Sequence, residues 1–146
     1  GLHGNEFSIY KFRSMVVNAE KEGAKMAVKN DARITPFGRI LRVFRIDELP
    51  QILSVIKGDM QFIGPRPERK VFVNQLNSLV PFYGTRHLIK PGITGWAQVK
   101  YKYGENLEDS IKKLEYDLYY ITNRSITLDL RIVFKTVTTV LFSRGV

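Results

Sequence analysis

Apolar residues recur at helical spacing along most of this chain. Between Pro36 and Phe44 they form one stripe, and Thr35 is suited to cap the first turn. The same spacing predicts a second helix from about Asp47 to Lys57, which Gly58 ends, and a third from about Glu68 to Val80. The pattern is that of a mostly helical protein.

Two more helices are predicted near the end of the chain. Their apolar positions are Ile111, Leu114, Leu118 and Ile121 in the first, and Leu130, Val133, Phe134, Val137, Val140 and Leu141 in the second. The apolar stripes of the final helix and of the Pro36–Phe44 helix suit either a protein core or a membrane interface. For each helix alone we favour the core; at an interface, nearby arginines would reach lipid phosphates.

Strand signals are confined to two segments. Alternation predicts a strand from Phe7 to Arg13, and a turn rich in glycine leads into a second short strand within Pro91–Tyr101. We expect these two strands to pair. The segment from Met15 to Asn30 has a weak helical pattern, and Asp59 to Pro67 is expected to be a rigid loop. Together the elements predict an α+β fold, a mostly helical single domain over residues 1–146 with a small β-hairpin.

The net charge of the chain restricts the kinds of partner, and so the classes of function, that we expect. The net charge is +9 over 146 residues, which favours an anionic partner such as a nucleic acid, a membrane surface or a phosphorylated substrate. The chain has no cysteine, which excludes disulfides and thiolate metal sites. No apolar run reaches the roughly 20 residues that span a bilayer. Because the sequence starts inside a glycine-containing turn, we expect a fragment of a longer protein.

Asp47 and Glu48 are the first candidates for chemistry. They are adjacent in the first turn of a predicted helix, where amide groups and the helix dipole favour carboxylates and phosphates. One carboxylate of such a pair can attack phosphorus while the other holds a divalent cation. Acidic residues are also common in the first turns of helices, so the pair alone leaves a purely structural interpretation open.

Basic residues near this pair favour a phosphate-binding site. The candidates are Lys11, Arg13, Arg42, Arg45 and Arg66. Arginine binds phosphate oxygens in a bidentate manner, and a nucleotide diphosphate must be neutralised before an anionic nucleophile can approach it. Arg66 lies between two prolines, so its placement would cost little conformational freedom.

Several short segments then point to one family. They are Lys11-Phe12-Arg13-Ser14-Met15, Asp47-Glu48-Leu49-Pro50-Gln51, Lys57-Gly58-Asp59-Met60, Gly64-Pro65-Arg66-Pro67, Pro91-Gly92-Ile93-Thr94-Gly95-Trp96-Ala97-Gln98-Val99 and Tyr116-Asp117-Leu118-Tyr119-Tyr120-Ile121. In this order, over nearly the whole chain, they resemble the bacterial sugar transferases, also called monotopic polyprenyl-phosphate phosphoglycosyl transferases. Each segment alone is a weak signal, whereas the set is specific.

The resemblance implies a reaction in two steps. Asp47 would attack the sugar-bearing phosphorus of a UDP-sugar and release UMP, and undecaprenyl phosphate would then take the phosphosugar from Asp47. Glu48 would bind Mg²⁺, together with Asp47. Arg42 and Arg66 match family positions that contact substrate phosphates, and Lys11 and Arg13 match a basic strand near them. The product lipids of this family start exopolysaccharide, O-antigen, capsule or glycan assembly.

The resemblance also implies a location. Family members carry a hydrophobic re-entrant helix just before the residues that match Gly1–Asn5, and they act at the cytoplasmic face of the bacterial inner membrane. We therefore expect amphipathic membrane-interfacial helices and an anionic membrane surface as a partner. Arg45 departs from the family pattern, because many members have a serine or threonine there.

Two other functions are weighed against this one. A basic nucleic-acid-binding module would explain the charge, but none of the helix-turn-helix, RNA-recognition or zinc signatures occurs, so we expect no nucleic-acid partner. A non-catalytic domain of a polysaccharide export assembly would have no physical need for Asp47, Glu48 and Arg66 together.

Overall fold

The computed structural model describes residues 1–101, apart from 22, 24, 26, 27 and 29, and residues 106–141. Two strands pair, β1 (Gln61–Ile63) and β2 (Gly92–Thr94). The helices are the 3-10 helices η1 (Leu2–Gly4), η2 (Ile46–Gln51) and η3 (Tyr83–Leu88) and the α-helices α1 (Pro36–Val43), α2 (Ile52–Ile56), α3 (Lys70–Leu79), α4 (Trp96–Lys100), α5 (Leu107–Thr122) and α6 (Ile126–Leu141). The mostly helical fold predicted from the sequence is confirmed.

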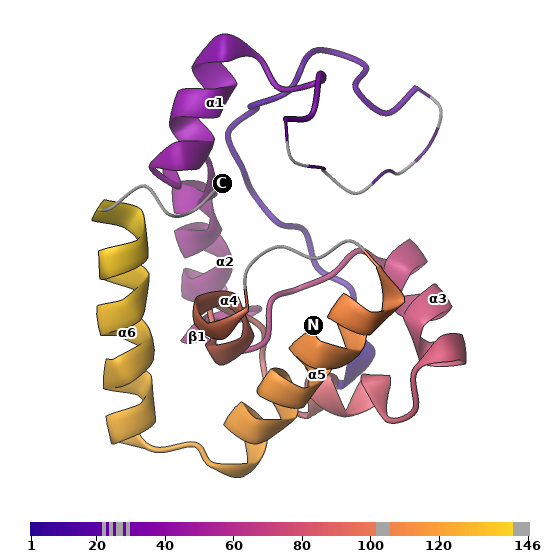
Figure 1. The fold of residues 1–146 in the computed structure, drawn as a ribbon, viewed down its shortest axis with the longest axis vertical. Helices are drawn as coiled ribbons and strands as arrows, with labels where there is room; N and C mark the ends of the chain where they lie inside the picture. The colour runs from indigo at the N-terminus through magenta and orange to yellow at the C-terminus, as the bar shows by residue number, and fades with distance from the viewer. Residues whose placement is uncertain (22, 24, 26–27, 29, 102–105, 142–146) are drawn as a thin grey trace.

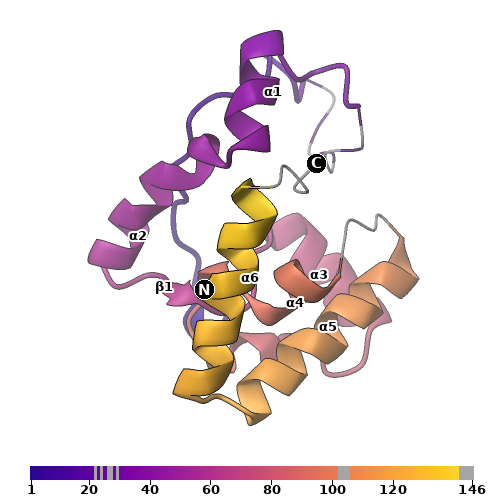
Figure 2. The same ribbon diagram turned by 60° about the vertical axis from the view of Figure 1, so that its left-hand side comes forward.

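The elements form two parts, an arm made of α1, η2 and α2 and a body made of the two strands and α3 to α6. Helices α1 and α2 follow one another along one side of the molecule, while α3, α4 and α5 gather on the other side (Figure 1; Figure 2). Helix α4 packs on α5, and α6 packs on α4 and on both strands. Helix α1 packs mainly on η2, the short helix that joins it to α2. The short helix η2 therefore lies between α1 and α2, on that side of the molecule.

The sheet differs from the predicted hairpin. β1 and β2 are parallel, with Gln61 opposite Gly92 and Ile63 opposite Thr94. Parallel strands need a long crossover connection, and α3 and η3 supply it. β1 lies inside the segment predicted as a loop, and Phe7–Arg13 forms no strand. Alternation misled the prediction because that segment runs beside η2 and α2 without a ladder of paired residues.

Glycines allow the two strands and the following loop to approach closely. A Cβ atom on Gly92 would lie 2.0 Å from the backbone nitrogen of Gly64, and one on Gly95 would lie 2.1 Å from the Gly64 carbonyl oxygen. No larger residue fits at these positions without moving the backbone. The chain immediately before Arg66 is therefore packed directly against the β2 segment.

The core has two parts, and α5 contributes to both. Leu76, Val80, Tyr83 and Leu114 form one cluster, and Tyr120, Leu128 and Ile132 form the other. In α6 the buried residues are thus Leu128 and Ile132, whereas Leu130 and Phe134 of the predicted core stripe are exposed. Helix α6 is apolar on more than one face, so periodicity alone selected the wrong one. Leu79 of α3 is exposed as well.

Helix α1 forms as predicted but does not bury its stripe. The Thr35 hydroxyl accepts a hydrogen bond from the Gly38 amide at 2.9 Å, and Pro36 opens the helix. Phe37 is nonetheless 67% exposed, and Ile40 and Phe44 are also exposed. In the described part of the chain no helix is both long and apolar enough to cross a bilayer.

The segment from Met15 to Asn30 does not form the weakly predicted helix in its described residues. These residues form turns, and residues 22, 24, 26, 27 and 29 lie outside the described part. Met15 pairs with Ile34 in an isolated antiparallel bridge, so the two ends of the segment lie side by side just before α1 begins. Near the end of this segment Asp31 forms an ion pair with Arg33, whose Nη2 lies 2.6 Å from Asp31 Oδ2.

Candidate active site

The two candidate carboxylates lie in η2, which is a 3-10 helix where the sequence predicted the first turn of an α-helix. Arg45 precedes it with φ of 55°, a left-handed conformation that is uncommon for a residue with a side chain. This turn redirects the chain from α1, and the Glu48 amide donates back to the Arg45 carbonyl at 3.2 Å. As a result Asp47 and Glu48 are buried, with 8% and 7% of their surfaces exposed.

Glu48 is surrounded by cations from three parts of the chain. Arg66 Nη2 donates to Glu48 Oε1 at 2.5 Å, and Lys11 Nζ lies 3.5 Å from the same oxygen. Arg45 Nη1 lies 3.6 Å from Glu48 Oε2. These partners come from the N-terminal segment, the turn before η2 and the loop after β1. Glu48 therefore holds the arm and the body together at the site.

The two carboxylates have opposite pKa shifts. Burial disfavours the charge of Glu48, but Arg66, with Lys11 and Arg45, outweighs that effect and lowers the pKa of Glu48 to about 2. Burial, reinforced by the negative charge of Glu48, raises the pKa of Asp47, against the opposing charges of Lys11 and Arg42. A carboxylate with a raised pKa is the more basic of the two, which suits a nucleophile.

Asp47 is left available for chemistry. Its carbonyl oxygen accepts a hydrogen bond from the Phe12 amide at 3.0 Å, which fixes its main chain. Within the described part of the chain, no side chain donates a hydrogen bond to its carboxylate, which accepts a backbone hydrogen bond from its own residue and lies near the charges of Lys11 and Arg42. A fixed backbone with a buried carboxylate to which no side chain donates is the arrangement expected of a group that reacts with a bound substrate.

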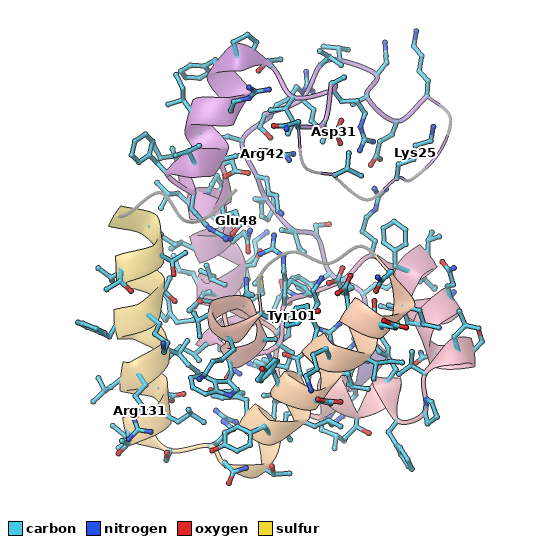
Figure 3. The ribbon with its side chains drawn as sticks, in the orientation of Figure 1. Lys25, Asp31, Arg42, Glu48, Tyr101 and Arg131 are labelled. Carbon is cyan, nitrogen blue, oxygen red and sulfur yellow. The ribbon has the colours of Figure 1, made fainter. Side chains whose placement is uncertain are left out.

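Arg42 is held beside this pair by the segment before α1. Its Nε donates to the hydroxyl of buried Ser14 at 2.8 Å. The contact depends on close packing, because a Cβ atom on Gly38 would lie 1.9 Å from the Ser14 carbonyl oxygen. Figure 3 shows Arg42 and Glu48 near one another where the arm meets the body, and Arg131 at the distant end of α6.

The loop that carries Arg66 is fixed by main-chain bonds to β2. The Gly64 amide donates to the Thr94 carbonyl at 2.8 Å, and the Gly92 amide donates to the Pro65 carbonyl at 2.9 Å. The sequence predicted that the flanking prolines would hold this loop. The structure adds the hydrogen bonds and glycine contacts that attach it to the sheet.

Most of the predicted site residues come together, and one does not. Lys11, Arg45 and Arg66 pair with Glu48, and Arg42 acts on Asp47. Arg13 is exposed and is not among the cations that pair with Glu48. Its assignment beside Lys11 rested on a strand that does not form. Ser14 is a site residue that the sequence reasoning missed, although it stands in one of the quoted motifs.

Asp47 and Glu48 are the residues that could together hold a divalent cation. The described residues contain no cluster of three or more carboxylate, histidine or cysteine side chains. Mg²⁺ is commonly held by one or two carboxylates, water and substrate phosphates, so this pair fits such an ion. The contacts of Lys11 and Arg45 with Glu48 are long, at 3.5 and 3.6 Å, and are the ones a cation could replace.

Buried carboxylates, arginines beside them and a proline-flanked loop are the features expected of a site for phosphate chemistry. The family model described as bacterial sugar transferase matches residues 1–143. The chain therefore belongs to the bacterial sugar transferase family, which is a family of transferase enzymes.

Named relatives agree with this family. The chain is 50% identical, over 99% of its length, to a UDP-N-acetylgalactosamine-undecaprenyl-phosphate N-acetylgalactosaminephosphotransferase of Aeromonas hydrophila, of which the match covers 34%. It is 45% identical over 94% of its length to a UDP-glucose:undecaprenyl-phosphate glucose-1-phosphate transferase of Klebsiella pneumoniae, covering 30% of that protein. It is 42% identical over its full length to the sugar transferase EpsL of Bacillus subtilis, covering 68% of that protein. The chain thus spans about a third of the length of the first two relatives.

Proposed function

We propose that this chain is the catalytic domain, over residues 1–146, of an enzyme that transfers a sugar 1-phosphate from a UDP-sugar to undecaprenyl phosphate. The proposal is supported by the names of its relatives, which are sugar-phosphate transferases acting on undecaprenyl phosphate. The observation that carries the mechanism is the contrast between Asp47, to whose buried carboxylate no described side chain donates a hydrogen bond, and Glu48, which is bound by Arg66.

In the proposed first step, a carboxylate oxygen of Asp47 attacks the phosphorus that bears the sugar. The bond from that phosphorus to the bridging oxygen breaks, and UMP leaves with the electron pair. Arg66 and Arg42 neutralise the donor's phosphates, which removes the repulsion between two anions. The phosphosugar is then held on Asp47 as a mixed anhydride.

In the proposed second step, a phosphate oxygen of undecaprenyl phosphate attacks the same phosphorus. The bond to Asp47 breaks, the lipid diphosphate sugar forms, and the Asp47 carboxylate is regenerated. A Mg²⁺ ion held by Glu48 and Asp47 would supply further neutralisation of the phosphate oxygens. Glu48 would keep its short contact with Arg66 and bind the cation through the same carboxylate.

The covalent step is tested by UMP release. We would incubate the protein in phospholipid vesicles with Mg²⁺ and a panel of UDP-sugars, first without and then with undecaprenyl phosphate. One UMP per chain without the lipid, and continuous release with it, is the result expected for the two-step reaction. Asp47→Asn should abolish both, whereas Glu115→Gln, an exposed carboxylate paired with Lys112, should change neither.

Two results would count against this proposal. Substantial turnover by Asp47→Asn would exclude the aspartyl intermediate. Failure of the folded wild-type protein to release UMP from any donor would favour the export-assembly domain considered from the sequence. The donor that is consumed would at the same time identify the transferred sugar.

We also propose that the exposed apolar stripe of α1 rests in the interface of the membrane that carries the acceptor lipid, on the cytoplasmic face. Phe37 and Ile40 of α1 and Phe44 directly after it are exposed, and so are Leu53 and Ile56 of α2. An uncovered apolar face of this kind marks an interaction surface. The positive net charge favours an anionic membrane.

Vesicle co-sedimentation tests the membrane contact. Vesicles with about 30% anionic lipid should retain the protein, and the pair Phe37→Ser and Ile40→Ser should weaken retention by about tenfold or more. Val71→Ser is the control, because Val71 is 61% exposed on α3, in the body. Equal weakening by the control would show that the effect is not specific to α1.

A further inference from the structure

A buried ion pair lies beneath the loop that carries Arg66. Arg86 belongs to η3, and Asp117 belongs to the Tyr-Asp-Leu-Tyr-Tyr segment of α5. Arg86 Nη2 lies 2.8 Å from Asp117 Oδ2, and the two residues are only 6% and 2% exposed. Neither residue touches the Asp47 and Glu48 carboxylates, so the proposed chemistry does not account for them.

The guanidinium of Arg86 contacts the loop that carries Arg66. Its Nη2 donates to the main-chain carbonyl of Arg66 at 2.8 Å, and its Nη1 donates to the Tyr83 hydroxyl at 2.6 Å. The side chain of Arg66 leaves in the other direction and donates to Glu48 at 2.5 Å. One residue, Arg66, is thus held at its carbonyl by Arg86 and at its guanidinium by Glu48.

Stability alone gives a weak reason for this pair. Removing two charges from water costs about as much as their attraction returns, and apolar replacements of buried pairs are often no less stable. Burial raises the pKa of Asp117, and the guanidinium of Arg86 opposes the rise. What the pair supplies is a fixed place for the Arg86 guanidinium. Its contact with Asp117 is an ion pair without hydrogen-bond geometry, whereas the directional bonds of Arg86 go to the Tyr83 hydroxyl and the Arg66 carbonyl.

We propose that Arg86 and Asp117 are positioning residues, which fix the main chain of Arg66 so that its side chain stands against Glu48 and the donor's phosphates. This proposal rests on the proposed transfer reaction. In the peptide that precedes Arg66, the Pro65 carbonyl accepts a hydrogen bond from the Gly92 amide. With both carbonyls held, the peptide before and the peptide after Arg66 cannot rotate freely, and the guanidinium stays in place.

A double-mutant cycle between Arg86 and Arg66 tests the coupling. Arg86→Lys keeps a positive charge near Asp117 but cannot reach Asp117, Tyr83 and the Arg66 carbonyl together. We expect it to lower kcat/KM for the UDP-sugar by about tenfold in the wild-type background. In the Arg66→Ala background the same change should have an effect of less than about twofold, because the side chain to be positioned is gone.

A control separates positioning from general loss of stability. Leu114→Ala also removes a buried contact of α5 in the cluster that contains Tyr83, but it removes no bond to Arg66. Assayed at a temperature where all variants are folded, it should retain kcat/KM within about twofold. If Arg86→Lys does not fold, Asp117→Asn, which keeps the size of the side chain and removes its charge, takes its place in the cycle.

Nuclear magnetic resonance gives a second readout that does not need turnover. The ¹⁵N relaxation of the Arg66 Nε–H group should show a rigid side chain in the wild-type protein and in Leu114→Ala, and a mobile one in Arg86→Lys. An inactive wild-type protein with this pattern would remove the proposed function and leave the positioning intact. Independent, multiplicative effects in the cycle, or an equally rigid Arg66 in Arg86→Lys, would overturn the inference.

Discussion

Replacing Glu48 by glutamine measures how strongly the site depends on one buried charge. Its pKa is lowered from 4.5 to about 2, and the residue is only 7% exposed, so solvent screens its ion pairs little. The interval between those values corresponds to about 3 kcal/mol of the free energy of unfolding at neutral pH. Glu48→Gln should remove about that amount at pH 7, because the amide cannot carry the charge that Arg66, Lys11 and Arg45 stabilise.

The pH dependence gives this prediction its sign. The folded-state pKa of Glu48 is depressed, so its contribution is fully present above pH 4.5 and is lost as the pH falls toward 2. The difference in stability between the wild-type protein and Glu48→Gln should therefore shrink to about half by a pH of about 3.3. Below that pH the two proteins should converge.

Urea unfolding followed by the fluorescence of the single tryptophan, Trp96, is a suitable assay. Unfolding curves at pH 7 and at about pH 3.3 give the two differences. Glu115→Gln is the matched control, since its partner Lys112 is exposed and such pairs contribute less than about 1 kcal/mol. A Glu48→Gln difference below about 1 kcal/mol at pH 7, or one that stays constant with pH, would refute the reasoning.

Three further predictions concern the supports of the site. Gly92→Ala should destabilise the fold by about 2 kcal/mol or more, because its Cβ would meet a backbone atom at 2.0 Å, whereas Gly84→Ala, whose nearest atom is at 3.6 Å, should be tolerated in thermal denaturation. Thr35→Ala should lower the free energy of unfolding by about 1 kcal/mol through loss of the α1 cap, and Thr35→Ser should restore most of it in the same measurement. Ser14→Ala should lower kcat/KM for the donor about fivefold by releasing Arg42, and an unchanged donor KM and kcat would contradict that role.

Local signals in the sequence predicted the parts of the fold that depend on neighbours along the chain. The cap at Thr35, the apolar spacing of α5 and the glycine at position 58, which has φ of 85°, all act within a few residues. The burial of the stripes was not predictable in the same way. Periodicity shows that a face of α1 is apolar, but only the tertiary structure shows that no other element among the described residues covers it.

The candidate site was predicted as a set of residue types, with limited geometry. Asp47, Glu48 and Arg66 were recognised from motifs, and the structure joins Glu48 to Arg66 at 2.5 Å. The errors came from contacts between distant segments. Lys11 reaches Glu48 from an extended segment with no strand partner, and the parallel pairing of β1 with β2 has no signature in either strand alone.

The contacts around Arg66 also set the order in which the site can form during synthesis. Lys11 and Glu48 are 37 residues apart, and the Arg86 bond to the Arg66 carbonyl closes a further 20 residues. Asp117, which holds Arg86, lies on a helix near the end of the described chain. A ribosome has therefore made both carboxylates and every basic residue of the site well before Arg66 can be locked in place. The growing chain can form α1 early, but α5 must emerge before Asp117 and Arg86 can fix the main chain of Arg66.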